Sequence, residues 1–157
     1  MSRKDFVKRT VVLPALYASL EKIGEFVNLA SREAGFNESD CYKVQLAVDE
    51  ACSNIIEHAY GGEAAEEDIT CTCKVTADNL VVELYDHGQA FDPTEIPVPD
   101  VKAALHARAT GGLGLYFMRQ LMDEVSFNFT PGSAGKNGVK SKQGNHLILI
   151  KHKGALS

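Results

Sequence analysis

Three short polar motifs beside apolar segments constrain the fold of this chain more than any other feature. The first is Asp49-Glu50-Ala51-Cys52-Ser53-Asn54, inside an expected helix. The second is Asp86-His87-Gly88, directly after an apolar strand, and the third is Gly111-Gly112-Leu113-Gly114-Leu115, before another expected helix. Each motif alone is weak, because polar pairs, Asp-x-Gly turns and glycine-rich linkers are common in soluble proteins. In this order, and in a chain this short, they indicate one composite site.

Length and charge limit the classes of function. A chain of 157 residues fits a single domain, 1–157, whose core we place at about residues 10–152. The formal net charge is −5 and Lys and Arg do not cluster, which argues against a nucleic-acid partner. No segment approaches the roughly twenty apolar residues of a membrane-spanning helix, and the N-terminal MSRKDFVKRT lacks the apolar run of a signal peptide. We therefore expect a cytoplasmic protein without a membrane partner.

Hydrophobic periodicity predicts an α+β fold. The expected elements are a strand at Val11–Leu13 stopped by Pro14, helices at Leu16–Ala34 and Ser39–Tyr60, strands at Ile69–Thr76 and Leu80–Tyr85, a helix at Gly114–Met122, and strands at Glu124–Phe129 and His146–Lys151. Ser39 is the expected N-cap of the second helix. That helix should bury a stripe made of Val44, Ala47, Val48, Ala51, Ile55 and Ala59. The sum is an α+β fold, with the helices on one face of a mixed or antiparallel sheet.

Cysteine and histidine residues do not form a metal-ligand set in this sequence. Cys71 and Cys73 point to the same face of an expected strand, so we expect them to pack in the core rather than bind a metal or form a disulfide. His58 lies four residues after Asn54, and it either approaches the same site or is a partly exposed helix residue. His87 is expected to be a spectator within its motif.

Glu50 and Asn54 are four residues apart, so they share one face of the second expected helix. A carboxylate at this place can act as a general base toward a hydroxyl group or water. An amide oxygen suits Mg²⁺, a hard cation that prefers oxygen ligands. The alternative is an ordinary exposed polar pair on an amphipathic helix.

Asp86 follows the apolar run Leu80–Tyr85 and precedes Gly88 by two residues. A carboxylate at the end of a strand can accept a hydrogen bond from an adenine amino group. A glycine lets the backbone approach a flat ring closely. The alternative is an Asp-x-Gly turn without a ligand.

The glycine-rich turn at 111–115 can bind phosphate, because its backbone amides and the positive end of the following helix dipole attract anions. It has neither the Walker pattern nor the Rossmann spacing. Arg108 and Thr110 lie just upstream, where a cation or a hydroxyl group could reach a terminal phosphate. The alternative is a glycine-rich linker.

The loop at 89–110 contains three prolines and no sustained period, and loops of this length in a compact domain are usually functional.

Together, the three motifs resemble those of the GHKL ATPase superfamily, which includes gyrase, Hsp90, histidine kinases and MutL. The likeness is strongest to its compact branch of anti-sigma factor serine/threonine-protein kinases, and it extends from about Thr10 to His152. LAVDEACSNIIEHAY resembles the N box, YDHGQAFDP the G1 box and TGGLGLYFMRQLMDEV the G2 box. The resemblance implies the Bergerat ATP-binding fold, a two-layer α/β sandwich.

The resemblance also implies a role for each site residue. Glu50 would be the catalytic base and Asn54 the Mg²⁺ ligand. Asp86 would bind the amino group of adenine, with Gly88 beside the ring. Phosphate-binding residues would come from the G2 box and its upstream neighbours: Arg108, Thr110, Gly111, Gly112, Leu113, Gly114 and Leu115. The loop from about Asp92 to Thr110 would be the ATP lid.

Members of that branch phosphorylate a serine or threonine of a small STAS-type anti-anti-sigma protein and sequester a sigma factor, commonly as homodimers. We therefore expect an ATP- and Mg²⁺-dependent kinase with these partners, acting in transcription regulation. Two alternatives stay open. One is a regulatory module of the same fold that binds ATP and a partner without phosphorylating it. The other is an α+β interaction domain that binds no nucleotide. The polar segment Pro131–Gly144 is longer than a tight hairpin needs, and it leaves the kinase subclass open.

Overall fold

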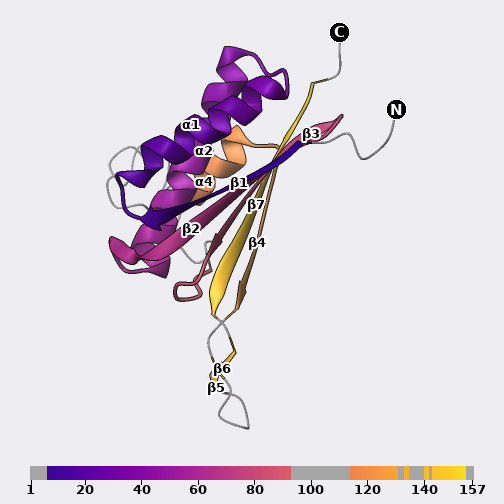
Figure 1. The fold of residues 1–157 in the computed structure, drawn as a ribbon. Helices are drawn as coiled ribbons and strands as arrows, with labels where there is room; N and C mark the ends of the chain where they lie inside the picture. The colour runs from indigo at the N-terminus through magenta and orange to yellow at the C-terminus, as the bar shows by residue number, and fades with distance from the viewer. Residues whose placement is uncertain (1–6, 93–113, 131–132, 135–139, 142, 155–157) are drawn as a thin grey trace, which may run out of the picture.

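The computed structural model describes residues 7–92, 114–130, 133–134, 140–141 and 143–154, and in these the helices cover one face of a sheet (Figure 1). The helices are α1 (Ser19–Glu33), α2 (Glu38–Asn54), the π-helix η1 (Ile55–Ala59) and α4 (Gly114–Leu121). The main sheet contains β1 (Val7–Ala15), β2 (Ala64–Val75), β3 (Asn79–Asp86), β4 (Glu124–Thr130) and β7 (Gly144–His152). The short strands β5 (Ser133–Ala134) and β6 (Lys140–Ser141) form a separate pair within the polar segment.

The five strands have the order β1-β2-β3-β7-β4, and each neighbouring pair is antiparallel. The expected α+β sandwich with helices on one face is therefore confirmed, and the described sheet is antiparallel rather than mixed. Cys71, Leu84 and Leu147 lie side by side on the three central strands, and all are buried. Because successive side chains of a strand point to opposite faces, the apolar side chains of neighbouring strands form rows across the sheet that face the helices.

The first strand is longer than predicted at both ends: it begins at Val7, and Pro14 does not stop it. β1 pairs with β2 from Val7 to Ala15, with a register shift between Pro14 and Ala15. Proline lacks a backbone N–H, but an edge strand can hold it where no partner needs that donor. The helix α1 follows after a short turn and begins at Ser19 rather than Leu16.

The second helix buries the predicted stripe, but its N-cap lies two residues earlier than expected. Asn37 is its N-cap, since the side-chain oxygen of Asn37 accepts a hydrogen bond of 2.8 Å from the Asp40 backbone N–H. Ser39 lies inside the first turn, so the predicted cap was wrong. All six residues of the stripe are buried. The last turn is the π-helix η1, closed by a 3.1 Å hydrogen bond from the Tyr60 N–H to the Ile55 carbonyl.

Cysteines pack in the core, as the sequence predicts. Cys52 of α2 and Cys71 and Cys73 of β2 are at most 2% exposed, and they and the buried Cys41 are free thiols. Burial raises the pKa of Cys52 and of Cys41, which disfavours the reactive thiolate. Among the described residues, no group of three or more His, Cys, Asp and Glu side chains could hold a metal ion.

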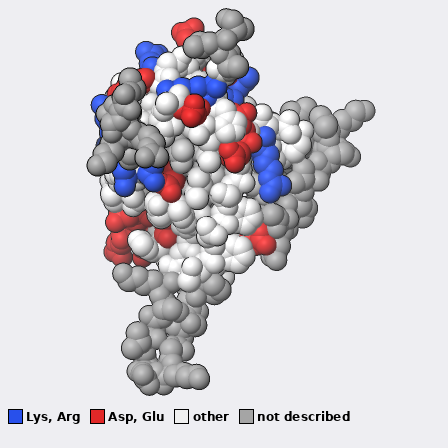
Figure 2. All heavy atoms as spheres, turned by 90° about the vertical axis from the view of Figure 1, so that its right-hand side faces the viewer, with Lys and Arg blue, Asp and Glu red and all other residues white. Residues whose placement is uncertain are grey.

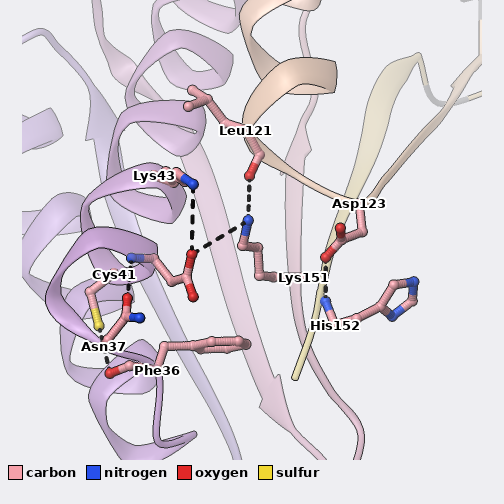
Figure 3. Close-up of polar contacts among 9 residues, drawn as sticks. Phe36, Asn37, Cys41, Lys43, Leu121, Asp123, Lys151 and His152 are labelled. Atoms are coloured by element: carbon pink, nitrogen blue, oxygen red, sulfur yellow. Dashed lines mark hydrogen bonds and ion pairs between the residues drawn. The ribbon is translucent and has the colours of Figure 1, made fainter. Parts of the chain in front are cut away.

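Two hydrogen bonds connect β7 to the C-terminal end of α4 and to the turn that follows this helix (Figure 3). The Lys151 ammonium donates a 2.8 Å hydrogen bond to the carbonyl of Leu121, the last residue of α4. In the turn that follows, the Asp123 carboxylate accepts a hydrogen bond of 2.6 Å from the His152 backbone N–H. A cation at a helix C-terminus is favourable because the carbonyl dipoles leave partial negative charge there. These contacts fix the helix that follows the glycine-rich turn.

The side of the molecule that carries the sheet has a mixed charge pattern (Figure 2). Lys and Arg lie close to Asp and Glu on this side, around a largely uncharged centre, and they do not merge into one basic surface. None of the described helices combines the length and the apolar character that crossing a bilayer requires.

Candidate nucleotide-binding site

A pocket lies between the C-terminal part of α2 and one end of the sheet. Its polar lining includes Asn54 from α2, Asp86 from the end of β3, and Asn145 from the start of β7. Its apolar lining comes from Ala51, Ile55, Leu84, Phe91, Met118, Phe127 and Leu147. A mostly apolar cavity with a few convergent polar groups is typical of a site for a flat organic ligand.

Asp86 is buried, and its two carboxylate oxygens are in different states. Oδ1 accepts hydrogen bonds of 2.9 Å from the Gly88 backbone N–H and from the Asn145 side-chain amide. Oδ2 is buried without a partner among the described residues. Burial raises the pKa of Asp86, while the hydrogen bonds from Asn145 and Gly88 oppose this shift. An unpaired buried acceptor costs about 1–3 kcal/mol, so a ligand that donates to Oδ2 would recover that energy.

Asn54 is also buried in the wall of this pocket, at the end of α2. It is 3% exposed, and its side-chain Nδ2 has no hydrogen-bond partner in the described part of the chain. Glu50 lies one turn earlier on the same helix and is half-buried. It does not belong to the residues that line the pocket itself. The helix therefore presents an amide inside the pocket and a carboxylate one turn away.

His58 holds a third buried side-chain nitrogen without a partner, Nε2, in the residues that the structure describes. Its ring lies 5.6 Å from the ring of Phe91, which lines the pocket. The π-helix places His58 beside the loop after β3. His58 is half-buried, as expected of a partly exposed helix residue, and it lies near the site without lining the pocket.

Gly88 packs directly on the end of η1. A Cβ atom at this position would lie 2.5 Å from the carbonyl oxygen of Ala59, closer than real contacts allow. The next residue, Gln89, donates its backbone N–H to the same oxygen at 2.7 Å. The glycine is therefore needed for the contact between the loop and the helix, and its expected place beside a ring stays a prediction.

The sequence matches the family described as the histidine kinase-like ATPase domain, over residues 13–151. The chain belongs to this family. The match covers all three motifs, and it confirms the resemblance to the GHKL superfamily. Three polar residues of this histidine kinase-like ATPase domain line one pocket: Asn54, Asp86 and Asn145.

Curated relatives of this chain are protein kinases. The serine-protein kinase RsbW of Listeria monocytogenes is 36% identical over 131 residues, which are 80% of this chain and 82% of the relative. The serine-protein kinase RsbW of Bacillus cereus is 27% identical over 136 residues, which are 84% of this chain and 82% of the relative. These relatives place the chain in the serine-protein kinase branch of the histidine kinase-like ATPases.

A solved structure has the same fold. It is the crystal structure of the SiaB-SiaC complex from Pseudomonas aeruginosa, similar with a TM-score of 0.58 and 14% identity. The similarity covers 90% of this chain and 88% of that chain. At this identity it shows the fold of the histidine kinase-like ATPase domain and no more.

The third motif lies mostly outside the described residues. These undescribed residues are Arg108, Thr110, Gly111, Gly112 and Leu113, so their phosphate contacts stay predictions. Gly114 is the first residue of α4, and the side chain of Leu115 is 6% exposed and packs in the core. If Leu115 contacts a phosphate, its backbone must do so. The predicted lid at 92–110 is described only at Asp92.

Asn145 is the site residue that the sequence did not predict. We expected the last strand to begin at His146, yet β7 begins at Gly144 and places Asn145 directly opposite Asp86. The pairing joins residues 59 positions apart in the chain, as the hydrogen bond between their side chains records. Because β7 lies between β3 and β4, the residues next to Asn145 in the sequence do not indicate which strand it pairs with or in which register.

Proposed function

We propose that this chain is an ATP-dependent serine/threonine-protein kinase. The observation that carries the proposal is that two buried polar atoms in one mostly apolar pocket, Asn54 Nδ2 and Asp86 Oδ2, have no hydrogen-bond partner among the described residues. Membership in the histidine kinase-like ATPase family and the serine-protein kinase relatives support ATP as the ligand.

The two unpartnered atoms fit a nucleotide, because Asp86 Oδ2 can accept a hydrogen bond from a base and Asn54 Nδ2 can donate one to a phosphate oxygen. Asp86 would accept the amino group of adenine through Oδ2, inside the apolar pocket. Asn54 would bind Mg²⁺ through its amide oxygen. Since the described residues offer no cluster of three or more metal-ligating side chains, we expect Mg²⁺ to complete its coordination with phosphate oxygens and water. Phosphate contacts would come from the glycine-rich turn before α4.

Glu50 would act on the acceptor hydroxyl group. Bound ATP supplies the phosphoryl group, and Mg²⁺ neutralises the charge that phosphoryl transfer develops. Glu50 would align the hydroxyl and accept its proton as the new oxygen–phosphorus bond forms and the bond to the leaving diphosphate breaks. Its half-buried position, one turn from Asn54, keeps the carboxylate within the same region and accessible to a protein substrate.

The proposed substrate is a serine or threonine of a small STAS-type anti-anti-sigma protein, and the proposed second partner is a sigma factor. The resemblance of the three motifs to the anti-sigma branch supports both partners, and the serine-protein kinase relatives support a protein substrate. A homodimer is part of the same proposal. We also propose that residues 1–157 act as one domain in the cytoplasm.

Transfer of labelled γ-phosphate tests this function. Wild type, Glu50→Gln and Asp49→Asn are incubated with Mg·ATP and extract of the source organism, and labelled proteins are identified. Asp49 is the matched control, because it is an exposed acid next to Glu50 but rotated to another face of α2. We expect wild type and Asp49→Asn to label one small protein on serine or threonine. Glu50→Gln should be slower by about 10²–10⁴-fold, the usual effect of removing a general base.

Two other outcomes change the assignment. If Glu50→Gln transfers phosphate as fast as wild type, Glu50 is not the base. If ATP binds and no labelled protein appears with any variant, the chain is a regulatory module, and its affinity for a partner should then differ between ATP and ADP.

A further inference from the structure

The side chain of Asn145 makes three hydrogen bonds to one short stretch of chain. Its Nδ2 donates to Asp86 Oδ1 at 2.9 Å and to the Gln89 carbonyl at 3.0 Å. Its Oδ1 accepts from the Phe91 backbone N–H at 3.2 Å. One amide side chain thus connects β7 to a carboxylate at the end of β3 and to two backbone groups of the loop that follows.

Gly144 makes this connection possible by letting β7 approach the end of β3. A Cβ atom on Gly144 would lie 2.4 Å from the Asp86 carbonyl oxygen, and the residue has a positive φ of 156°. The neighbouring residues, Asp86 and Asn145, are direct partners in the β3–β7 register. Any larger residue at 144 would push the two strand ends apart, and with them the two side chains.

The contacts of Asn145 determine which oxygen of Asp86 is left for a ligand. Oδ1 already receives two hydrogen bonds, one from Asn145 and one from Gly88, while Oδ2 receives none from the described residues. Rotation of the carboxylate would break both bonds, so it is held in one orientation. From this geometry we propose that Asn145 is a positioning residue for base selectivity, acting through Asp86 and the loop 89–91.

The inference rests on the proposed ATP site and concerns how that site distinguishes purines. Adenine presents an amino group at its sixth position, which donates to a carboxylate oxygen. Hypoxanthine, the base of inosine triphosphate (ITP), presents a carbonyl oxygen there, which an acceptor repels. A fixed Oδ2 discriminates between the two, whereas a carboxylate that rotates freely discriminates less.

The test compares the binding of ATP and ITP, measured by calorimetry without turnover. Wild type is expected to bind ATP at least about tenfold more tightly than ITP. Asn145→Ala should lose about 10–100-fold in ATP affinity, the range for a hydrogen bond to a charged group, and much less in ITP affinity. The ratio of the two affinities is the readout, because a general loss of packing would weaken both nucleotides equally.

Asn79 provides the matched control at the opposite end of the same strand pair. It is the first residue of β3, it pairs with His152 of β7, and its side-chain Oδ1 contacts His152 Nδ1 at 2.6 Å. Asn79→Ala removes an amide contact across the same ladder but far from the pocket. We expect it to leave the ratio of ATP to ITP affinity unchanged.

A second variant keeps the inference testable if Asn145→Ala does not fold. Asn145→Thr suits a strand and retains a hydroxyl that can donate to Asp86, but it cannot also hold Gln89 and Phe91. Its affinity ratio should lie between those of wild type and Asn145→Ala. A folded Asn145 variant with the wild-type ratio would overturn the inference, as would an equal loss of affinity for both nucleotides. A wild type that binds neither nucleotide contradicts the proposed function instead.

Discussion

Asp86 shows how a single residue favours ligand binding at the expense of the fold. The carboxylate of Asp86 is 3% exposed, and one of its oxygens has no partner in the part of the chain that the structure describes, which lowers the stability of the protein without ligand. The same oxygen is ready to accept a donor at no cost of reorganisation. Burial raises the pKa of Asp86 from its ordinary value of 3.8, so the folded state binds the proton more tightly than the unfolded state.

The substitution Asp86→Asn should therefore stabilise the protein and abolish adenine binding. Because the folded-state pKa is raised, wild-type stability falls as the pH rises through that pKa, while the amide does not titrate. We expect Asp86→Asn to melt about 2–4 °C higher at neutral pH, the shift that roughly 1 kcal/mol gives in a chain of this size. The advantage should shrink as the pH is lowered through the raised pKa. Thermal melting at several pH values measures this, and an advantage that grows toward acid pH would contradict the assignment.

At the scale of single residues, the sequence predicted the polar groups that follow a local pattern. Asn54 lies at helical spacing after Glu50, and Asp86 ends an apolar strand, so both could be found and both line the pocket. Asn145 could not be found, because its role depends on which strand lies beside β3. The roles of Glu50 and Asn54 in catalysis and metal binding stay predictions.

Among the elements, α2 shows where periodicity is informative and where it fails. The buried stripe repeats every three or four residues, and apolar spacing reveals it directly. The start of the helix depends instead on which polar residue is the N-cap, Asn37 or Ser39. The N-cap needs an extended backbone and a side chain that can accept a hydrogen bond from a backbone N–H of the first turn. Asn37 has that extended conformation, and Ser39 is already helical. The π-helix at the other end likewise has no periodic signature of its own.

The assignment of the cap predicts unequal effects of two similar substitutions. Asn37→Ala should lower the free energy of unfolding by about 1 kcal/mol, because it removes the hydrogen bond to the Asp40 backbone N–H. Ser39→Ala should change it by less than about 0.5 kcal/mol, as expected at an exposed position inside the first turn. Urea denaturation of both variants measures the difference. A larger effect at Ser39 would restore the sequence-based cap.

Over the whole molecule, the site joins helices and sheet, so binding there should stabilise the complete fold. The pocket is lined from α2, β3, α4, β4 and β7, and a ligand inside it contacts elements from both layers. A ligand that binds only the folded state at a hundred times its dissociation constant adds about 2.7 kcal/mol.

We therefore expect Mg·ATP at that concentration to raise the melting temperature by about 5–10 °C. The rise should be lost with Asp86→Ala, which removes the acceptor for the base. It should be smaller for ATP with a chelator, because Asn54 would then lack its bridging cation. Differential scanning fluorimetry gives both comparisons. An equal rise with and without the chelator would count against the role proposed for Asn54.

The position of β7 has a consequence for how the chain folds. It is the last described strand in the sequence, yet it lies between β3 and β4. β3 cannot complete its pairing until β7 lies beside it, and because the paired residues are far apart in the chain, we expect these contacts to form late. Leu147 and Leu149 bring the core to completion in the same step that carries Asn145 to Asp86. The adenine end of the pocket thus forms together with the core, and no partly folded intermediate that lacks β7 has a complete base-binding site.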